Sequence, residues 1–173
     1  MNSSGLLYIS VNTCKINPRR VKFKMTRDEY FMRMALEEAL KSFESAEIPV
    51  GAVMVSGDEV LSRAHNEILS RNDPTAHAEI IALRQATHNI ANYRLPGSIL
   101  IVTIEPCIMC VGAMIQARIE ELIYGAADPR YGAVRSCYQL ADENKLNHRI
   151  QVRSGILEKE CGALMSSFFA SRR

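Results

Sequence analysis

Two short motifs restrict what this 173-residue chain can fold into more than any other feature. His77 and Glu79 are separated by one residue, and Pro106 stands directly before Cys107, which is followed three positions later by Cys110. An imidazole and two thiolates form a ligand set that suits zinc. Structural zinc usually takes four protein ligands, whereas hydrolytic zinc takes three and leaves a position for water. The motifs therefore predict one Zn²⁺ per subunit, bound by His77, Cys107 and Cys110, in a fold that brings them together.

Glu79 is a carboxylate that this ligand set does not need. Because bound zinc lowers the pKa of water from about 15.7 towards about 7, a nearby carboxylate can act as the general base and then deliver the proton. Two alternatives remain from the residues alone. The cysteines could be a redox pair, or they could form a structural zinc site with the histidine and either His65 or Cys137. Neither alternative needs Pro106 or Glu79, so the catalytic interpretation is favoured.

Both motifs are expected at the starts of helices. Asp73-Pro74 predicts a helix that runs to about His88, because aspartate can cap a helix and proline suits its first turn. Pro106 predicts in the same way a helix that runs to about Ala117. Two helix N-termini would then meet around one metal ion, and their positive dipole ends favour the thiolate form of cysteine.

Patterns elsewhere predict an α/β domain over residues 25–173. Thr26, with Glu29 three positions later, predicts the capped start of an amphipathic helix. Apolar runs between turn signals predict strands at residues 50–55, 59–63, 98–104, 121–124 and 150–152. Helical spacing predicts a helix at 133–141 and a last one with one apolar face, formed by Leu157, Cys161, Leu164, Met165 and Phe168. Strands that alternate with helices indicate one sheet covered on both faces.

Residues 1–24 differ from the rest of the chain in charge. They hold five basic and no acidic residues, which leaves 16 basic and 19 acidic residues in the remainder. We expect a flexible basic leader here. Either Met25 is the natural start and the leader is an artefact of the assigned start, or the leader is a basic arm for RNA. Because the remainder is slightly acidic, a nucleic-acid role there depends on local basic patches.

The chain also lacks the signals of a membrane or secreted protein. No apolar run approaches the roughly 20 residues that cross a bilayer, and no signal-peptide pattern opens the sequence. The five cysteines are odd in number, and two of them stand at metal spacing. We therefore expect a reduced, cytoplasmic setting and no membrane partner.

Six blocks of sequence surround the motifs with residues typical of one family. They are Ile48–Ala52, Asn72–Ile80, Asn92–Leu95, Glu105–Met114, Leu146–Arg149 and Phe168-Phe169. The spacing His-x-Glu with Pro-Cys-x-x-Cys is the signature of zinc-dependent nucleobase deaminases. From about Met25 to Arg173 the chain closely resembles the bacterial tRNA-specific adenosine deaminases, a branch of the cytidine deaminase-like superfamily. The resemblance implies a three-layer α/β/α fold around a central five-stranded mixed sheet.

This family converts adenosine to inosine at the wobble position of a transfer RNA anticodon. The resemblance therefore implies the same reaction here, with an anticodon stem-loop as partner, in a homodimer with one zinc ion per subunit. It implies that Glu79 moves protons. It also implies contacts with the substrate from four positions, namely the side chains of Asn66 and Asp128 and the main chain of Ala78 and Pro106.

Two departures from the family pattern fall in the segment expected to approach RNA. Family members usually have a basic residue where this chain has Ala127, and Gly-Ser where it has Arg135-Ser136. Phe168 or Phe169 could border the RNA site, because flipped bases stack on aromatic rings. Several basic residues could contact phosphates, namely Lys145, Arg149, Arg153, Arg172 and Arg173.

Two other functions stay open at this stage. The same metal site could deaminate a free base or nucleotide, of the guanine or cytosine type. The chain could also be a catalytically silent RNA-binding or partner subunit, although all four residues needed for the chemistry are present.

Overall fold

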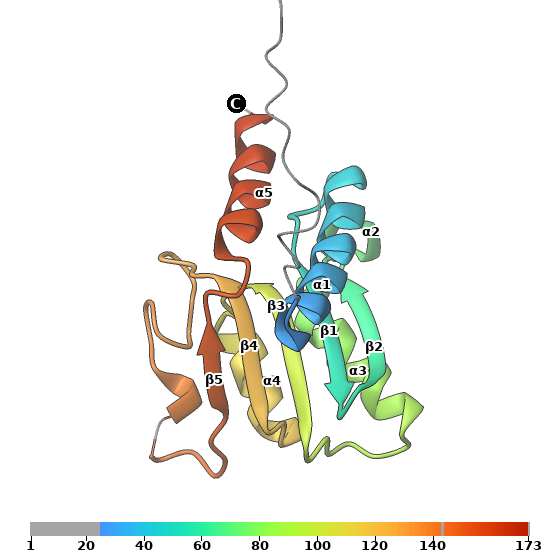
Figure 1. Ribbon diagram of the computed structural model, residues 1–173, viewed down its shortest axis with the longest axis vertical. Helices are drawn as coiled ribbons and strands as arrows, with labels where there is room; N and C mark the ends of the chain where they lie inside the picture. Colours follow the sequence, from blue (N-terminus) through green and yellow to red (C-terminus); the bar gives the residue numbers. More distant parts are fainter. Residues whose placement is uncertain (1–24, 143, 173) are drawn as a thin grey trace, which may run out of the picture.

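Five strands form one mixed sheet in the order β2-β1-β3-β4-β5 (Figure 1). The computed structural model describes residues 25–142 and 144–172, so the hypotheses about residues 1–24 lie outside the described residues. The strands are β1 (Gly51–Ser56), β2 (Glu59–His65), β3 (Ser98–Ile104), β4 (Glu121–Ala126) and β5 (Gln151–Ser154). β1 runs antiparallel to β2 and β3, whereas β3, β4 and β5 are parallel. The five predicted strands and the mixed sheet are confirmed.

Helices cover both faces of this sheet, which gives the expected three layers (Figure 1). Alternate residues of β1 pack into two hydrophobic cores, one on each face of the sheet. Val53 and Val55 pack with residues of the helices on one face, while Ala52 and Met54 pack with residues of the helices on the other. The first face carries α1 (Arg27–Glu44) and α5 (Glu158–Ala170), and the second carries α3 (Ala78–Asn89) and α4 (Ile108–Ala117).

Helix α1 begins as predicted. The Thr26 hydroxyl accepts a hydrogen bond from the Glu29 N–H, and the Glu29 carboxylate accepts one from the Thr26 N–H. The helix lies close to β1 because position 51 is glycine. A Cβ atom there would come within 2.0 Å of the Ala35 carbonyl oxygen, so any side chain would push α1 away from the sheet.

The predicted helix at 133–141 is wrong. The described residues there form turns, followed by a short 3₁₀ helix, η1 (Leu140–Asp142). The physical reason is a competing acceptor. The N–H groups of Val134, Arg135 and Ser136 all donate to the carboxylate of Glu105, so this stretch is shaped by a distant side chain.

The start of α3 is also later than predicted, because Asp73 closes a turn instead of capping the helix. Its carboxylate accepts hydrogen bonds from the N–H and the hydroxyl of Thr75, at 2.8 and 2.7 Å. The helix then begins at Ala78, with His77 as its N-cap residue. A short helix that the sequence did not predict, α2 (Ile68–Arg71), precedes this turn. In the described part of the chain no helix is both long and apolar enough to cross a membrane.

Candidate active site

One edge of the sheet collects the residues of both motifs. β2, β3 and β4 run in the same direction, since β1 is antiparallel to both of its neighbours and β3 is parallel to β4. Asn66 directly follows β2, Glu105 directly follows β3, and Asp128 lies two residues beyond β4. The carboxyl ends of parallel strands are the usual place for binding sites in α/β proteins. Segments far apart in the sequence therefore converge at this edge.

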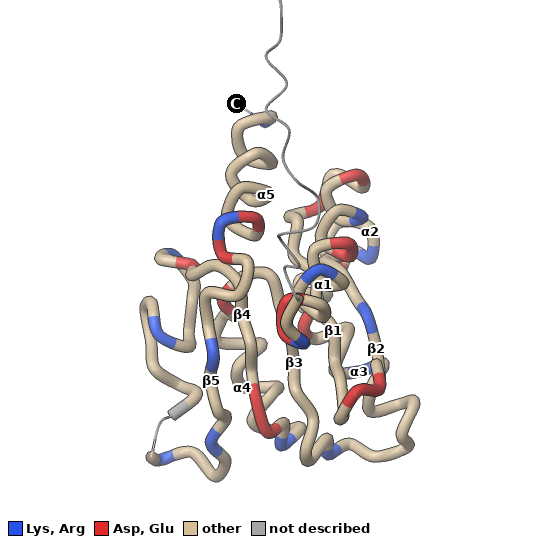
Figure 2. The backbone as a smooth tube through the Cα atoms, in the orientation of Figure 1, with Lys and Arg blue, Asp and Glu red and all other residues tan. Residues whose placement is uncertain are grey.

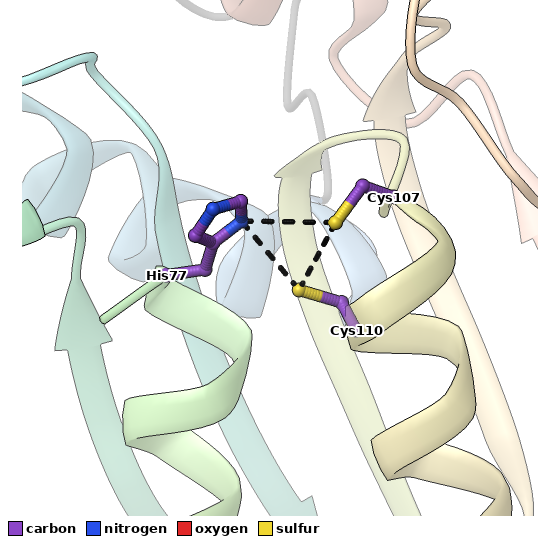
Figure 3. A group of neighbouring side chains, drawn as sticks. All are labelled: His77, Cys107 and Cys110. Atoms are coloured by element: carbon purple, nitrogen blue, oxygen red, sulfur yellow. Dashed lines mark hydrogen bonds between the residues drawn. The ribbon is translucent and has the colours of Figure 1, made fainter. Parts of the chain in front are cut away.

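The three predicted metal ligands meet at this edge (Figure 3). The Nδ1 atom of His77 lies 3.8 Å from the Cys107 sulfur and 3.7 Å from the Cys110 sulfur, and the two sulfurs are 3.7 Å apart. Tetrahedral zinc with bonds of about 2.3 Å to sulfur and about 2.0 Å to nitrogen needs sulfur–sulfur and sulfur–nitrogen separations of about 3.8 and 3.6 Å. Both the donor chemistry and the spacing fit one zinc ion.

Two helix N-termini present these ligands, as the sequence predicted. His77 is the N-cap residue of α3 and Cys107 is the N-cap residue of α4, and Cys110 lies one turn into α4 (Figure 3). N-cap side chains commonly accept a hydrogen bond from their own helix. Neither His77 nor Cys107 does so, which leaves both side chains available to a metal ion.

The protonation of the ligands is set by their mutual contacts. The pKa of Cys107 falls to about 4, because the Cys110 side chain and then His77 hydrogen-bond to its sulfur. The same hydrogen bond, together with burial, raises the pKa of Cys110. The hydrogen bond with Cys107 also raises the pKa of His77. Cys107 is therefore the ligand that loses its proton most readily, and a divalent cation would displace protons from the rest of the group.

Glu79 lies beside the ligand group without joining it. It is the second residue of α3 and is buried, and it lines the same cavity as His77 and Cys107. Burial raises its pKa, so the carboxyl group holds a proton more readily than an exposed glutamate does. A carboxyl group with a raised pKa is better suited than an exposed one to hold a proton between taking it up and delivering it.

The structural-zinc alternative fails on geometry. Among the described residues, only His77, Cys107 and Cys110 come together as a group that could hold a metal ion. His65 is turned away and its Nδ1 atom lies 3.1 Å from Glu38, while the Cys137 thiol donates to the Pro129 carbonyl oxygen at 3.4 Å. Within residues 25–142 and 144–172, no fourth side chain closes the site, and a position stays open there for a substrate or water.

A cavity of about 1070 Å³ opens beside the ligand group. Asn66, His77, Glu79, Cys107 and Asp128 all line it, so most of the residues expected to act on a substrate share one space. Its other walls are largely apolar and are formed by Ile48, Val50, Ile68, Ile104, Met165 and Phe169. Apolar walls with a few convergent polar groups are typical of a ligand site.

Ala78 and Pro106, whose main chain is expected to contact the substrate, are not among the residues that line the cavity. The side chains of Ala78 and Pro106 are buried, so only their backbone groups can face a ligand. As the first residue of α3, Ala78 has an N–H that the helix itself does not use. The Pro106 carbonyl oxygen already accepts a hydrogen bond from the Ala133 N–H at 2.8 Å, which leaves it one further lone pair.

Of the basic and aromatic residues considered as RNA contacts, some line the cavity and others are held elsewhere by contacts within the protein. Arg153 forms ion pairs with Asp28 and Glu121 beside β5, whereas Arg172 reaches the cavity. Phe168 is buried against Phe43 with ring centroids 5.7 Å apart, whereas Phe169 is exposed and lines the cavity. Basic and acidic residues are interspersed over the described chain (Figure 2), so RNA affinity would depend on such local groups.

Sequence reasoning missed Glu105 and the segment that it holds. Its carboxylate is buried and accepts hydrogen bonds from the backbone of residues 128 and 134–136. Burial acts to raise its pKa, but hydrogen bonds from Ser136 and the backbone outweigh this effect and hold the pKa below its usual value. The available signal was an acidic residue at the end of an apolar strand, directly before Pro106. Arg130 and Tyr131, which line the cavity, were not predicted from the sequence either.

Comparison with known proteins supports this description. Residues 25–126 match the sequence profile of the cytidine and deoxycytidylate deaminase zinc-binding region. The chain is 47% identical over 153 residues to a tRNA-specific adenosine deaminase of Haemophilus influenzae, which covers 88% of each chain. It is 42% identical over 149 residues to a protein of the same name from Bacillus subtilis, which covers 86% of this chain and 92% of that one.

A solved structure from studies of A-to-I editing by tRNA:A34 deaminases superposes with a TM-score of 0.76. It is 43% identical, and the match covers 78% of this chain and 98% of that one. A guanine deaminase from Nitrosomonas europaea superposes with a TM-score of 0.72 at 22% identity, over 82% of this chain and 84% of that one. At this identity the second likeness concerns the fold alone.

Proposed function

The chain belongs to the family of tRNA-specific adenosine deaminases, and we propose that it hydrolyses adenosine to inosine at the wobble position of a tRNA anticodon. The observation that carries the proposal is the open group of His77, Cys107 and Cys110 beside the buried carboxyl group of Glu79, in one cavity. Three ligands with an adjacent proton carrier form a hydrolytic site.

His77, Cys107 and Cys110 would hold a zinc ion, which would supply an activated water at neutral pH. Glu79 takes a proton from the attacking water as its oxygen adds to C6 of the purine. Glu79 delivers this proton to the ring nitrogen. It then takes the second proton of the former water from the new hydroxyl group at C6 and passes it to the exocyclic amine, which leaves as ammonia while C6 becomes a carbonyl. The raised pKa of Glu79 suits this exchange, because in every turnover the carboxylate must take up protons from the water and hold them until they are delivered.

Four positions would orient the base. Asn66 is buried at the end of β2 and lines the cavity, where its amide can read the edge of an extruded purine. The unused N–H of Ala78 and the free lone pair of the Pro106 carbonyl would orient the ring and the leaving amine. Asp128 lies at the cavity wall and would contact the nucleotide, although one of its oxygens also accepts from the N–H groups of Arg130 and Tyr131.

The size and lining of the cavity support an RNA substrate over a free base. Its volume of about 1070 Å³ exceeds what one purine needs. Arg130 and Arg172 lie among the lining residues and can contact phosphates. Exposed Tyr131 and Phe169 offer rings on which neighbouring bases can stack. A base in an anticodon loop is also cheaper to extrude than a paired one.

We include two further points in the proposal, the homodimer and the cytoplasmic setting. The homodimer is what membership of the family implies, and Ile108, at the first position of α4 and directly beside Cys107, exposes 51% of its surface and would be available to a partner subunit. The described cysteines are all free, which suits a reducing compartment. Light scattering of the purified protein tests the first point, since a mass equal to one chain would exclude the dimer.

The activity is tested with anticodon stem-loops that carry adenosine or guanosine at the wobble position, alongside free adenine, guanine and cytosine. We expect ammonia release and inosine only with the adenosine stem-loop, and turnover that is lower by about 10²-fold or more in a matched Glu79→Gln protein. Faster release from a free base would favour the alternative of a free-base deaminase. A zinc-loaded protein without turnover on any of these substrates would instead favour the silent RNA-binding subunit.

A further inference from the structure

A buried carboxylate stands between the sheet and the metal site. Glu105 directly follows β3, lies two residues before Cys107 and exposes only 3% of its surface. Its Oε1 atom accepts hydrogen bonds from the N–H groups of Val134, Arg135 and Ser136, at 3.1, 2.7 and 2.9 Å. Its Oε2 atom accepts from the Asp128 N–H at 3.2 Å and from the Ser136 hydroxyl. Five donors from one segment of chain thus converge on a single side chain.

The segment is shaped to wrap around this carboxylate. A Cβ atom at Gly132 would lie 2.4 Å from the Glu105 carboxyl carbon and 2.5 Å from the Asp128 carbonyl oxygen, so glycine alone permits the approach. The Gly132 N–H donates to that same Asp128 oxygen at 2.9 Å, and the Ala133 N–H donates to the Pro106 oxygen at 2.8 Å. Residues 128–136 therefore close onto Glu105 and Pro106, directly before the ligand Cys107.

The outer side of this segment forms a wall of the substrate cavity. Asp128, Pro129, Arg130 and Tyr131 all line it, and Tyr131 exposes 70% of its surface there. The wall contains no helix or strand that would hold it in place. Its position depends on short turn contacts, on the burial of Ala133 and Val134 in the core, and on the hydrogen bonds to Glu105 and Pro106. The Arg135 guanidinium adds a bond to the Val152 carbonyl oxygen on β5 at 3.2 Å.

We propose that Glu105 is a positioning residue, whose carboxylate fixes the wall formed by residues 128–131 and thereby sets how tightly the cavity holds its substrate. The inference rests on the proposed function, because the substrate meant is the RNA nucleotide. Glutamate suits the task because its two oxygens accept all five bonds. Glutamine would keep one oxygen for residues 134–136 but would turn an NH₂ group towards the Asp128 N–H, where two donors would face each other.

The test compares Glu105→Gln with the wild-type protein and with Glu38→Gln, both variants at full zinc occupancy. Glu38 is equally buried, at 3% exposure, but its carboxylate binds Lys41 and Arg63 and it does not line the cavity. We expect Glu105→Gln to raise KM for the adenosine stem-loop by about tenfold, the effect of a lost hydrogen bond to a charged group, while kcat changes less than threefold. Glu38→Gln should lower thermal stability and leave KM unchanged.

A second measurement does not depend on turnover. Hydrogen exchange at the amides of residues 128–136 should be slow in the wild-type protein and faster in Glu105→Gln, first of all at Asp128. The milder variant Ser136→Ala removes one of the five bonds and covers the case in which Glu105→Gln does not fold. Its KM should rise by a smaller factor in the same direction.

The outcomes separate the inference from the proposed function. If Glu105→Gln loses stability as Glu38→Gln does but keeps the wild-type KM, Glu105 is merely structural and the inference is overturned. If the wild-type protein does not deaminate the stem-loop, the proposed function fails, and hydrogen exchange alone decides whether Glu105 holds the wall. Equal exchange at residues 128–136 in both proteins overturns the inference in either case.

Discussion

Gly51→Ala is the substitution for which the structure sets the clearest magnitude. The added methyl group would lie 2.0 Å from the Ala35 carbonyl oxygen and 2.5 Å from the Ala39 nitrogen, both backbone atoms of α1. Since carbon and oxygen need about 3 Å or more, α1 has to move by about 1 Å, and a flexible side chain cannot relieve the clash. Overpacking of this kind costs about 3 kcal/mol at the upper end of its usual range.

Part of this cost is offset, because alanine restricts the unfolded chain more than glycine by about 1 kcal/mol. We therefore expect a net loss of about 2 kcal/mol in the free energy of unfolding, which for a domain of this size lowers Tm by about 4–8 °C. Thermal unfolding and urea denaturation measure both quantities. The control is Gly162→Ala in α5, whose added methyl group would make an ordinary 3.8 Å contact with the Ala126 Cβ atom and should not lower Tm. Equal Tm values for the two variants would refute the packing argument.

Three further predictions concern the chemistry of the site and the charge network of α1. Glu79→Gln should keep one zinc ion per chain by elemental analysis but lose about 10²–10⁴-fold in kcat; wild-type turnover would exclude Glu79 as the proton carrier. A chelator should remove the zinc and abolish turnover, and added zinc should restore it, whereas activity in metal-free protein would contradict the hydrolytic site. Burial acts to raise the pKa of Glu38, but hydrogen bonds from Lys41 and His65 outweigh this effect and hold the pKa below the usual 4.5. The ionised Glu38 carboxylate therefore stabilises the folded protein above about pH 4.5, and this stabilisation is lost as the pH falls through the lower pKa of the folded state. Glu38→Gln should accordingly lose less stability than the wild-type protein on acidification below about pH 4.5 in denaturation series, and equal losses would count against the network.

The ligand set could be predicted from sequence because its parts are local. Cys107 and Cys110 share one turn of helix, and the residue types themselves specify zinc. Strands were predicted well for the same reason, since alternation and apolar runs report burial within a few residues. The position of Asn66 beside the ligands depends instead on β2 and β3 ending at the same edge of the sheet. That property belongs to the whole topology, and only the family resemblance pointed to it.

The errors have a common physical cause, which is a competing hydrogen bond to a carboxylate side chain. At Asp73 the competitor was local, because Thr75 occupied the carboxylate that was expected to cap α3. At residues 133–141 the competitor was distant, since Glu105 lies about thirty residues earlier and takes three successive N–H groups. Local propensity cannot report an acceptor of this kind, because the pairing exists only after β3 and β4 have formed.

The two departures from the family pattern, at Ala127 and Arg135, affect different properties of the cavity wall. The first changes its charge, and the second changes how it is held against β5. Ala127 lines the cavity and removes a positive charge there, but Arg130 stands three residues later in the same wall. The Arg135 guanidinium is directed to the edge strand β5, so this residue braces the wall and does not contribute charge to the cavity. None of these residues touches His77, Cys107 or Cys110. Because the zinc ligands sit on helix starts, whereas the proposed RNA contacts lie on a separate segment that hydrogen-bonds to Glu105, the wall can change its charge without disturbing the zinc ligands.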